Sequence, residues 1–101
     1  MIRHVVMWKL KNPADATEFK ARLDLCSHLV PGTVEFEVGI RSDAREANVD
    51  VVLISTFTDA AALAAYQNHP QHQAVSAFLG TLRESRTVLD FETQASPPAA
   101  A

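Results

Sequence analysis

The stretch Ile2–Leu10, IRHVVMWKL, decides the fold because both of its faces carry apolar side chains. Successive side chains of a β-strand point to opposite sides of the sheet. Val6 and Trp8 therefore share one face, and Val5 and Met7 share the other. Since a sheet face that lies in water is normally polar, this alternation predicts a strand that is covered on both sides.

Three further segments have strand patterns. Residues 33–40 alternate between apolar and polar side chains, and residues 49–57 form a nearly continuous apolar run dominated by β-branched residues. The first pattern is typical of a half-buried strand, and the second of a central strand buried on both faces. Residues 87–92 alternate again and predict the last strand, while the polar segment 41–48 predicts a solvated loop.

The first predicted helix lies between the first two strands. Asn12 and Pro13 are typical of a helix start, and Asp15 with Glu18 forms a competing capping box. Apolar residues at helical spacing continue as far as Val30, before Pro31 and Gly32 end the helix.

The second helix is predicted to start after Thr58 or Asp59 and to break before Pro70. Proline disfavours the α conformation of the residue before it, here His69, but is well accepted at the first position of a helix. The helix is therefore expected to restart at Pro70 and to carry an apolar stripe as far as Leu82.

The resulting order, β-α-β-β-α-β, is that of an α+β, ferredoxin-like domain with a four-stranded antiparallel sheet and both helices on one face. The other sheet face would then expose Val5, Met7 and part of residues 49–57. An exposed apolar face of this size marks an interaction surface. We therefore expect two copies to pack sheet against sheet, as a homodimer that closes into a barrel.

Length and composition limit the classes of function. The 101 residues suit one domain, expected over residues 1–92, with a disordered tail over 93–101. A net charge of −3 without a Lys/Arg cluster does not favour nucleic-acid binding. No apolar run is long enough to cross a membrane, and the N-terminus lacks the pattern of a signal peptide. The single cysteine, Cys26, is expected to be an inert core thiol, which fits a reducing cytoplasm.

Four polar residues are the candidates for chemistry. Tyr66 and His69 lie three positions apart, within reach of one helical face, and His72 falls in the first turn after Pro70. A helix N-terminus disfavours an imidazolium, so His72 is expected to be neutral near pH 7 and able to act as a base. Structural roles are the alternatives: His4 as a satisfied core residue, His69 as a helix-junction cap, and Tyr66 and His72 as packing residues.

A transition-metal site at these histidines is not favoured. His69 and His72 could supply two ligands and His4 a third, but zinc sites need three or four ligands in regular geometry. The pair spans the break at Pro70 and has no carboxylate or cysteine nearby in sequence. His28, at the expected end of the first helix, is explained by the favourable interaction of a cation with a helix C-terminus.

Three segments resemble one known family. They are residues 2–11, IRHVVMWKLK, residues 49–57, VDVVLISTF, and residues 62–72, ALAAYQNHPQH. Together with His4, the Tyr-x-x-His-Pro-x-His motif is similar to the stress-responsive dimeric α/β-barrel family, often abbreviated Dabb, over residues 1–92. The resemblance implies a ferredoxin-like protomer and a homodimer that closes into a barrel.

The resemblance also implies roles for the candidate residues. The best-understood relative, a plant olivetolic acid cyclase, closes a linear polyketide thioester by aldol condensation without a redox cofactor. By similarity, His72 takes the position of the general base, Tyr66 that of a substrate-orienting tyrosine, and His4 that of a strand-one histidine. His69 matches a further family histidine. A pocket histidine of the cyclase is replaced here by Val51, which separates this chain from that particular reaction.

The resemblance further implies a metal and a pocket. Some family members bind Mg²⁺ through backbone carbonyls after the first helix, and the corresponding residues here are Ser27, Val30 and Thr33. No other cofactor is implied. A small-molecule pocket is expected between the sheet and the helices. Its expected apolar lining is Val6, Trp8, Leu23, Val51, Phe78 and Leu82.

These observations lead to three functional hypotheses. The sequence best supports a homodimeric, stress-responsive α/β-barrel domain with a small apolar ligand pocket of unassigned activity. The first alternative is a cofactor-independent cyclase or isomerase that acts on a small carbonyl compound and uses His72 as general base. The second alternative, from the wider barrel superfamily, is a cofactor-free monooxygenase or a haem-handling protein.

Overall fold

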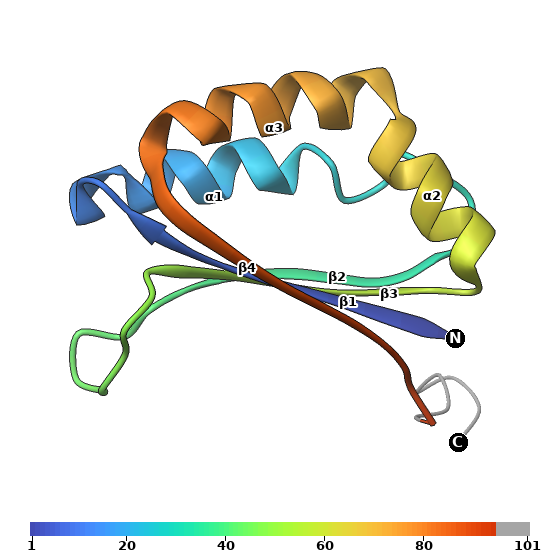
Figure 1. Cartoon of the computed structure of the whole chain (residues 1–101), viewed down its shortest axis with the longest axis horizontal. Helices are drawn as coiled ribbons and strands as arrows, with labels where there is room; N and C mark the ends of the chain where they lie inside the picture. Colours follow the sequence, from blue (N-terminus) through green and yellow to red (C-terminus); the bar gives the residue numbers. More distant parts are fainter. Residues whose placement is uncertain (95–101) are drawn as a thin grey trace.

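The computed structural model describes residues 1–94, and its strands and helices follow the predicted order (Figure 1). The strands are β1 (Ile2–Leu10), β2 (Thr33–Ile40), β3 (Val51–Phe57) and β4 (Arg83–Glu92). The helices are a short 3₁₀ helix, η1 (Pro13–Asp15), and the α-helices α1 (Ala16–Asp24), α2 (Ala60–Asn68) and α3 (Pro70–Leu82). Most of the predicted tail, residues 93–101, lies outside the described residues.

The strands form one antiparallel sheet in the order β2-β3-β1-β4. The helices cover one face of this sheet and leave the other face uncovered (Figure 1). This arrangement confirms the α+β, ferredoxin-like protomer expected from the sequence. No helix within residues 1–94 is long and apolar enough to cross a membrane.

The helix-covered face of the sheet carries the hydrophobic core. β1 contributes Val6 and Trp8, and α1 contributes Phe19, all of them buried. The rings of Trp8 and Phe19 meet edge to face, with their centroids 5.1 Å apart. Burying side chains of this size stabilises the fold by about 1.5–3 kcal/mol each. The core therefore holds α1 firmly against the sheet on this side.

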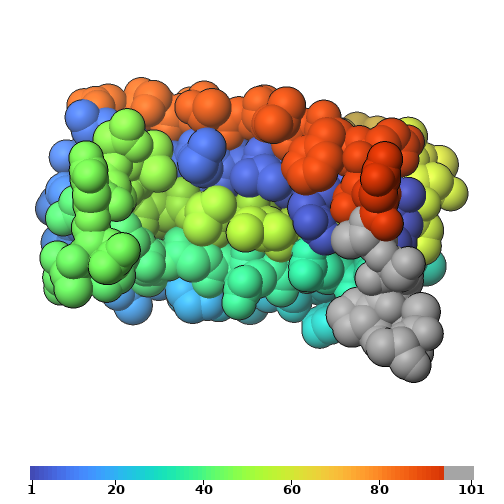
Figure 2. All heavy atoms as spheres, turned by 90° about the horizontal axis from the view of Figure 1, so that it is seen from below, coloured from blue at the N-terminus to red at the C-terminus, as the bar shows by residue number. Residues whose placement is uncertain are grey.

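The opposite face of the sheet is apolar but open. Met7 of β1 and Leu89 and Phe91 of β4 are exposed, and Val5 pairs with Leu89 across the two strands. Figure 2 looks onto this face, with β4 in orange and red beside β1 in blue. The apolar side chains on both faces of β1 thus reflect a core on one side and an uncovered apolar sheet on the other.

The helix α1 is shorter than predicted. It ends at Asp24, and the residues that follow, as far as Val30, form turns and bends. The amides of residues 25–27 bond to carbonyls three residues back, which is the tighter pattern in which α-helices commonly end. His28 therefore lies in a turn, and its predicted place at a helix C-terminus is wrong. Cys26 is still buried, and burial raises the pKa of its thiol, as expected for an inert core cysteine.

Two strands begin at other residues than predicted. β3 starts at Val51 rather than at residue 49, after Asp50, whose carboxylate accepts the backbone N–H of Leu10 at 2.8 Å. β4 starts at Arg83 rather than at residue 87, because it follows α3 directly and pairs with the end of β1 at Leu10. The polar residues 83–86 belong to a strand that apolar alternation alone did not reveal.

The break between α2 and α3 lies where the sequence predicted it. His69 has an extended backbone (φ −65°, ψ 133°), and Pro70 is the first residue of α3. The Nδ1 atom of His69 accepts the backbone N–H of Gln71 at 3.1 Å, so the imidazole caps the new helix. At the start of α2, the Asp59 carboxylate accepts the amide of Ala62 at 2.8 Å.

Gly32 ends the connection between α1 and β2 in a conformation that favours glycine. Its φ is +90°, and its carbonyl accepts the backbone N–H of Thr58 at 2.9 Å. A Cβ at this position would lie 2.7 Å from the Thr58 hydroxyl oxygen and 3.0 Å from the Cβ of Ala62. Gly80, inside α3, has no heavy atom within 4 Å of the position that its Cβ would take.

These two glycines give a matched test of the fold. Gly32→Ala is expected to lower the free energy of unfolding by about 2 kcal/mol or more, because alanine is strained at a positive φ and collides with the start of α2. Gly80→Ala is expected to raise it by about 0.5–1 kcal/mol, because alanine favours the helix. Urea unfolding followed by circular dichroism measures both, and equal effects of the two substitutions would contradict the structure.

Candidate functional site

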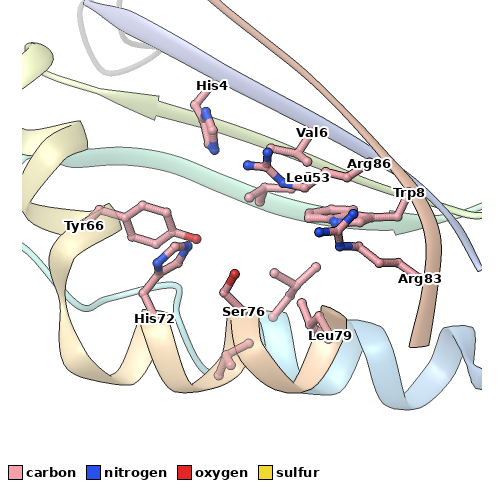
Figure 3. Close-up of a pocket in the computed structure, with 12 residues that line it drawn as sticks. His4, Val6, Trp8, Leu53, Tyr66, His72, Ser76, Leu79, Arg83 and Arg86 are labelled. Carbon is pink, nitrogen blue, oxygen red and sulfur yellow. The ribbon is translucent and has the colours of Figure 1, made fainter. Parts of the chain in front are cut away.

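A cavity of about 310 Å³ lies between the sheet and α3 (Figure 3). The side chains around it come from β1, β3, β4 and the three α-helices. They are His4, Val6, Trp8, Leu23, Leu53, Tyr66, His72, Val75, Ser76, Leu79, Arg83 and Arg86. Apolar and polar residues contribute equally to its lining, six of each, and the apolar half suits the body of a small molecule.

Tyr66 projects from α2 into this cavity with its whole ring buried. Its ring packs against those of His72 and Phe57, at centroid distances of 4.5 and 5.2 Å. The hydroxyl is buried and has no hydrogen-bond partner among residues 1–94. Burial raises the pKa of Tyr66, so the group stays protonated at neutral pH and is a hydrogen-bond donor.

His72 stands beside Tyr66 in the first turn of α3. Its Nδ1 atom lies 3.0 Å from the carbonyl oxygen of Gln67. Because a carbonyl can only accept, Nδ1 carries the proton of the neutral ring and Nε2 keeps its lone pair. Burial lowers the pKa of His72, and the charges of His4 and Arg86 lower it further, against the opposing effect of the Gln67 carbonyl. The direction agrees with the sequence prediction, and burial is the leading cause.

His4 approaches the cavity from β1 and is buried. Its Nδ1 atom is hydrogen-bonded to a carboxylate oxygen of Asp90, the residue directly opposite it on β4. A carboxylate accepts, so Nδ1 is the donor and Nε2 is the nitrogen left for the cavity. The backbone carbonyl of His4 also accepts the Ser55 hydroxyl at 3.0 Å, which fixes this part of β1.

The sequence of the chain matches the model of one protein family. The model, described as the stress responsive A/B barrel domain (Dabb), covers residues 2–93. The chain belongs to this family. No curated protein matches the sequence of this A/B barrel domain.

Solved structures agree with the family in fold. A dimeric ferredoxin-like protein of unknown function from Jannaschia sp. CCS1 is 32% identical, with a TM-score of 0.74 over 91% of this chain and 98% of that one. A dimeric ferredoxin-like protein of unknown function from Thermobifida fusca is 20% identical, with a TM-score of 0.81 over 91% and 90% of the two chains. SnoaB from Streptomyces nogalater, described as a cofactor-independent oxygenase, is 20% identical, with a TM-score of 0.75 over 96% of each chain.

The structure of this A/B barrel domain brings together three of the four predicted catalytic residues. His4, Tyr66 and His72 surround the same cavity, with centroids of Tyr66 and His4 6.5 Å apart. His69 does not line the cavity, because its imidazole turns back to cap α3. His69 therefore has the helix-capping role that the sequence analysis gave as its alternative.

Half of the predicted pocket lining lies elsewhere. Val6, Trp8 and Leu23 line the cavity, but Val51, Phe78 and Leu82 do not. Val51 is buried at the start of β3, and Leu53, two residues further along the strand, lines the cavity in its place. Phe78 faces α1 instead, where the guanidinium of Arg22 lies 4.2 Å from its ring centroid. Leu82, the last residue of α3, packs against the core.

The predicted magnesium ligands lie in the turns between α1 and β2. The carbonyl of Val30 accepts the hydroxyl of Thr33 at 3.0 Å. Ser27 and Thr33 line a shallow surface hollow beside Asp24 and Glu35. Within residues 1–94, no three His, Cys, Asp or Glu side chains gather into a metal-binding group. A magnesium site formed by backbone carbonyls stays a prediction from the family resemblance.

Besides Ser76 of α3, sequence reasoning missed three polar residues of the site, Arg83, Arg86 and Asp90. All three belong to β4, where the alternation of apolar residues is weakest. Asp90 can be assigned to His4 only when the register between β1 and β4 is known. The spacing of these residues is a usable signal. Arg86, Val88 and Asp90 lie two positions apart and therefore share one face of the strand, opposite the face of Leu89, which predicts polar side chains on the helix-covered side.

The buried hydroxyl of Tyr66 leads to a prediction about stability. Tyr66→Phe removes a polar atom that has no partner within the described residues, while the ring contacts stay. The substitution is expected to raise the free energy of unfolding by about 1 kcal/mol, because the cost of burying an unpaired hydroxyl disappears. Urea unfolding measures the change. A destabilisation of similar size would mean that the hydroxyl stabilises the fold.

Proposed function

We propose that this domain catalyses cofactor-independent acid/base chemistry on a small carbonyl compound. The proposal rests on one observation: a protonated hydroxyl that can donate, that of Tyr66, and a neutral acceptor, the Nε2 atom of His72, stand side by side in one cavity. A purely structural pair would be expected to satisfy the buried hydroxyl within the protein. The free donor and acceptor favour catalysis over a role in packing alone.

In the proposed reaction, Nε2 of His72 removes a proton from the carbon next to the carbonyl group. The electron pair of the C–H bond moves into the new C=C bond, and the carbonyl oxygen becomes an enolate oxygen. This oxygen accepts a hydrogen bond from the Tyr66 hydroxyl. With a β,γ-unsaturated carbonyl compound, return of the proton from His72 to the γ carbon gives isomerisation. With a dicarbonyl compound, the enolate carbon attacks the second carbonyl of the same molecule, and the alkoxide that forms takes the proton from His72, which gives cyclisation. General-base and oxyanion contributions are each about 10²-fold or more.

His4 and Asp90 form the second polar element of the proposed site. Asp90 holds the His4 ring through Nδ1, in the way that carboxylates orient catalytic and metal-binding histidines. The Nε2 atom of His4 then offers a fixed contact for a second oxygen of the substrate. We assign His4 a positioning role, because Tyr66 and His72 already supply the acid and the base.

Two other functions are less well supported by this chain. A non-catalytic binding protein would use the same cavity, with the Tyr66 donor and the His72 acceptor as contacts for its ligand, but it would not require the lowered pKa of His72. The oxygenase SnoaB shares 20% sequence identity with this chain, so the comparison supports a common fold and not a common activity.

We propose that two copies of the chain pack with their open sheet faces together. The support is the exposed apolar surface of Met7, Leu89 and Phe91, and the description of two of the similar structures as dimeric. Burying these side chains against a second copy would remove apolar area from water at about 25 cal/mol per Å². The family name, an A/B barrel, fits a barrel closed by two such sheets.

The catalytic proposal is tested by proton exchange. In D₂O, the protein is expected to speed the loss of the methylene ¹H NMR signal of 1-phenylpropan-2-one above the rate in buffer. His72→Gln should reduce this acceleration by about 10²-fold. The matched control is His28→Gln, an exposed histidine outside the cavity, which should change nothing.

The pH profile of the same exchange is a second readout. Because burial lowers the pKa of His72 below 6.5, its lone pair persists to lower pH, and the acid limb should have its midpoint below 6.5. Exchange no faster than in buffer, or full activity of His72→Gln, would remove the proposal.

The dimer is tested with two substitutions on one strand. Leu89→Arg places a charge on the open face and is expected to give monomers in sedimentation velocity at micromolar concentration. Val88→Arg is the control, because Val88 is also exposed but pairs with Val6 and faces the helix side. It should leave the dimer intact. A wild-type protein that sediments as a monomer would contradict the proposal directly.

A further inference from the structure

The cavity contains two positive charges for which the proposed proton transfer has no use. The side chains of Arg83 and Arg86 extend into it from β4, on the side opposite Tyr66 and His72 (Figure 3). Both residues lie at the polar start of β4.

A β-bulge places both arginines on the same side of the sheet. Residues three apart on a regular strand point to opposite faces. Here the pairing of β1 with β4 shifts between Lys9 and Leu10, so that Leu10 lies opposite Arg83 and β4 carries one extra residue. Both arginines consequently line the cavity. The carboxylate of Glu84, the extra residue, forms an ion pair with the Nζ atom of Lys9 at 3.2 Å. Bulges often re-aim side chains at binding sites.

The two arginines have no carboxylate partner. Within residues 1–94, neither Arg83 nor Arg86 forms an ion pair, whereas Arg3 pairs with Glu35 and Arg41 with Asp50. Asp90, the nearest acidic candidate on the helix-facing side of β4, is bound to His4. The charge of Arg86 also adds to the fall in the pKa of His72 that burial causes, and it opposes the larger rise that burial causes in the pKa of Tyr66, so it acts within the cavity and not only at its rim.

We propose that the cavity binds a small carboxylic acid with an apolar body, whose carboxylate lies between Arg83 and Arg86. The planar guanidinium presents paired donors that match the two oxygens of a carboxylate. The walls beside the arginines are Val6, Trp8 and Leu79, which suit an aryl or alkyl body better than a sugar or a phosphate ester. The volume of about 310 Å³ is near the lower end of small-molecule sites.

The inference deepens the proposed function by naming its substrate class as a keto acid. With the carboxylate held at β4, the carbonyl end of the molecule points to Tyr66 and His72. The carboxylate site itself depends on the arginines alone and does not require turnover. The two proposals can therefore fail separately.

Binding of a matched acid and amide tests the inference. The probes are 3-phenylpropanoate and 3-phenylpropanamide, which have the same shape but differ in charge. Trp8, the chain's single tryptophan, lines the cavity and reports binding by its fluorescence. The acid is expected to bind about tenfold or more tightly than the amide, as for other charge-assisted hydrogen bonds.

Variants assign this preference to the arginines. Arg86→Gln and Arg83→Gln should each weaken the binding of the acid about tenfold and leave that of the amide unchanged. Arg45→Gln removes the same charge from the exposed loop between β2 and β3 and should have no effect. Three results would each overturn the inference: equal affinities of acid and amide in the wild type, equal losses of acid and amide binding in an arginine variant, or no binding of the acid at millimolar concentration.

Two further measurements separate the proposals and the ligand chemistry. If 1-phenylpropan-2-one exchanges normally but acid and amide bind alike, the carboxylate site is wrong and the acid/base site stands. If the acid is preferred but no ketone exchanges, the carboxylate site stands as a binding site. Inorganic phosphate should not displace 3-phenylpropanoate at equal concentration, and displacement would overturn the assignment to carboxylates.

Discussion

The pairing of β1 with a strand on each side is the constraint on which the other features depend. Through it, β1 directs His4, Val6 and Trp8 toward the helices and Val5 and Met7 away from them. A shift of this register by one residue would exchange the two sets, placing an imidazole on the open face and valine and methionine under α3. The cavity and the open apolar face are therefore two results of one strand alignment.

The helix-covered side adds a second constraint, the break at His69. An unbroken helix from α2 into α3 would carry the second half away from the sheet instead of across it. The extended conformation at His69 redirects the chain, so that Tyr66 from one helix and His72 from the next meet at a centroid distance of 4.5 Å. The proline that breaks the helix thus serves the site by geometry, while His69 itself stabilises the new helix start.

Most of the fold and part of the site followed from the sequence, for identifiable physical reasons. The strand alternation, the helix starts and the effect of Pro70 are local, so single segments such as Ile2–Leu10 carry enough information. The end of α1 and the start of β4 were misjudged, because the turns after Asp24 and the polar residues after Leu82 depend on tertiary contacts. Asp90, Arg83 and Arg86 were missed because their meaning lies in register and in a bulge, which no local pattern encodes.

The extra residue of β4 separates the charge of the cavity from the rest of the architecture. Deleting Glu84 would restore plain alternation with Arg83 and Arg86 two positions apart, so both arginines would still face the cavity. A β4 of the present length that paired with β1 without the bulge would instead turn Arg83 to the other face, with His4, Tyr66 and His72 left in place. Chains of this family that keep the length of β4 but lose the bulge should consequently accept molecules of different charge on the same scaffold, which is a short evolutionary route from one ligand to another.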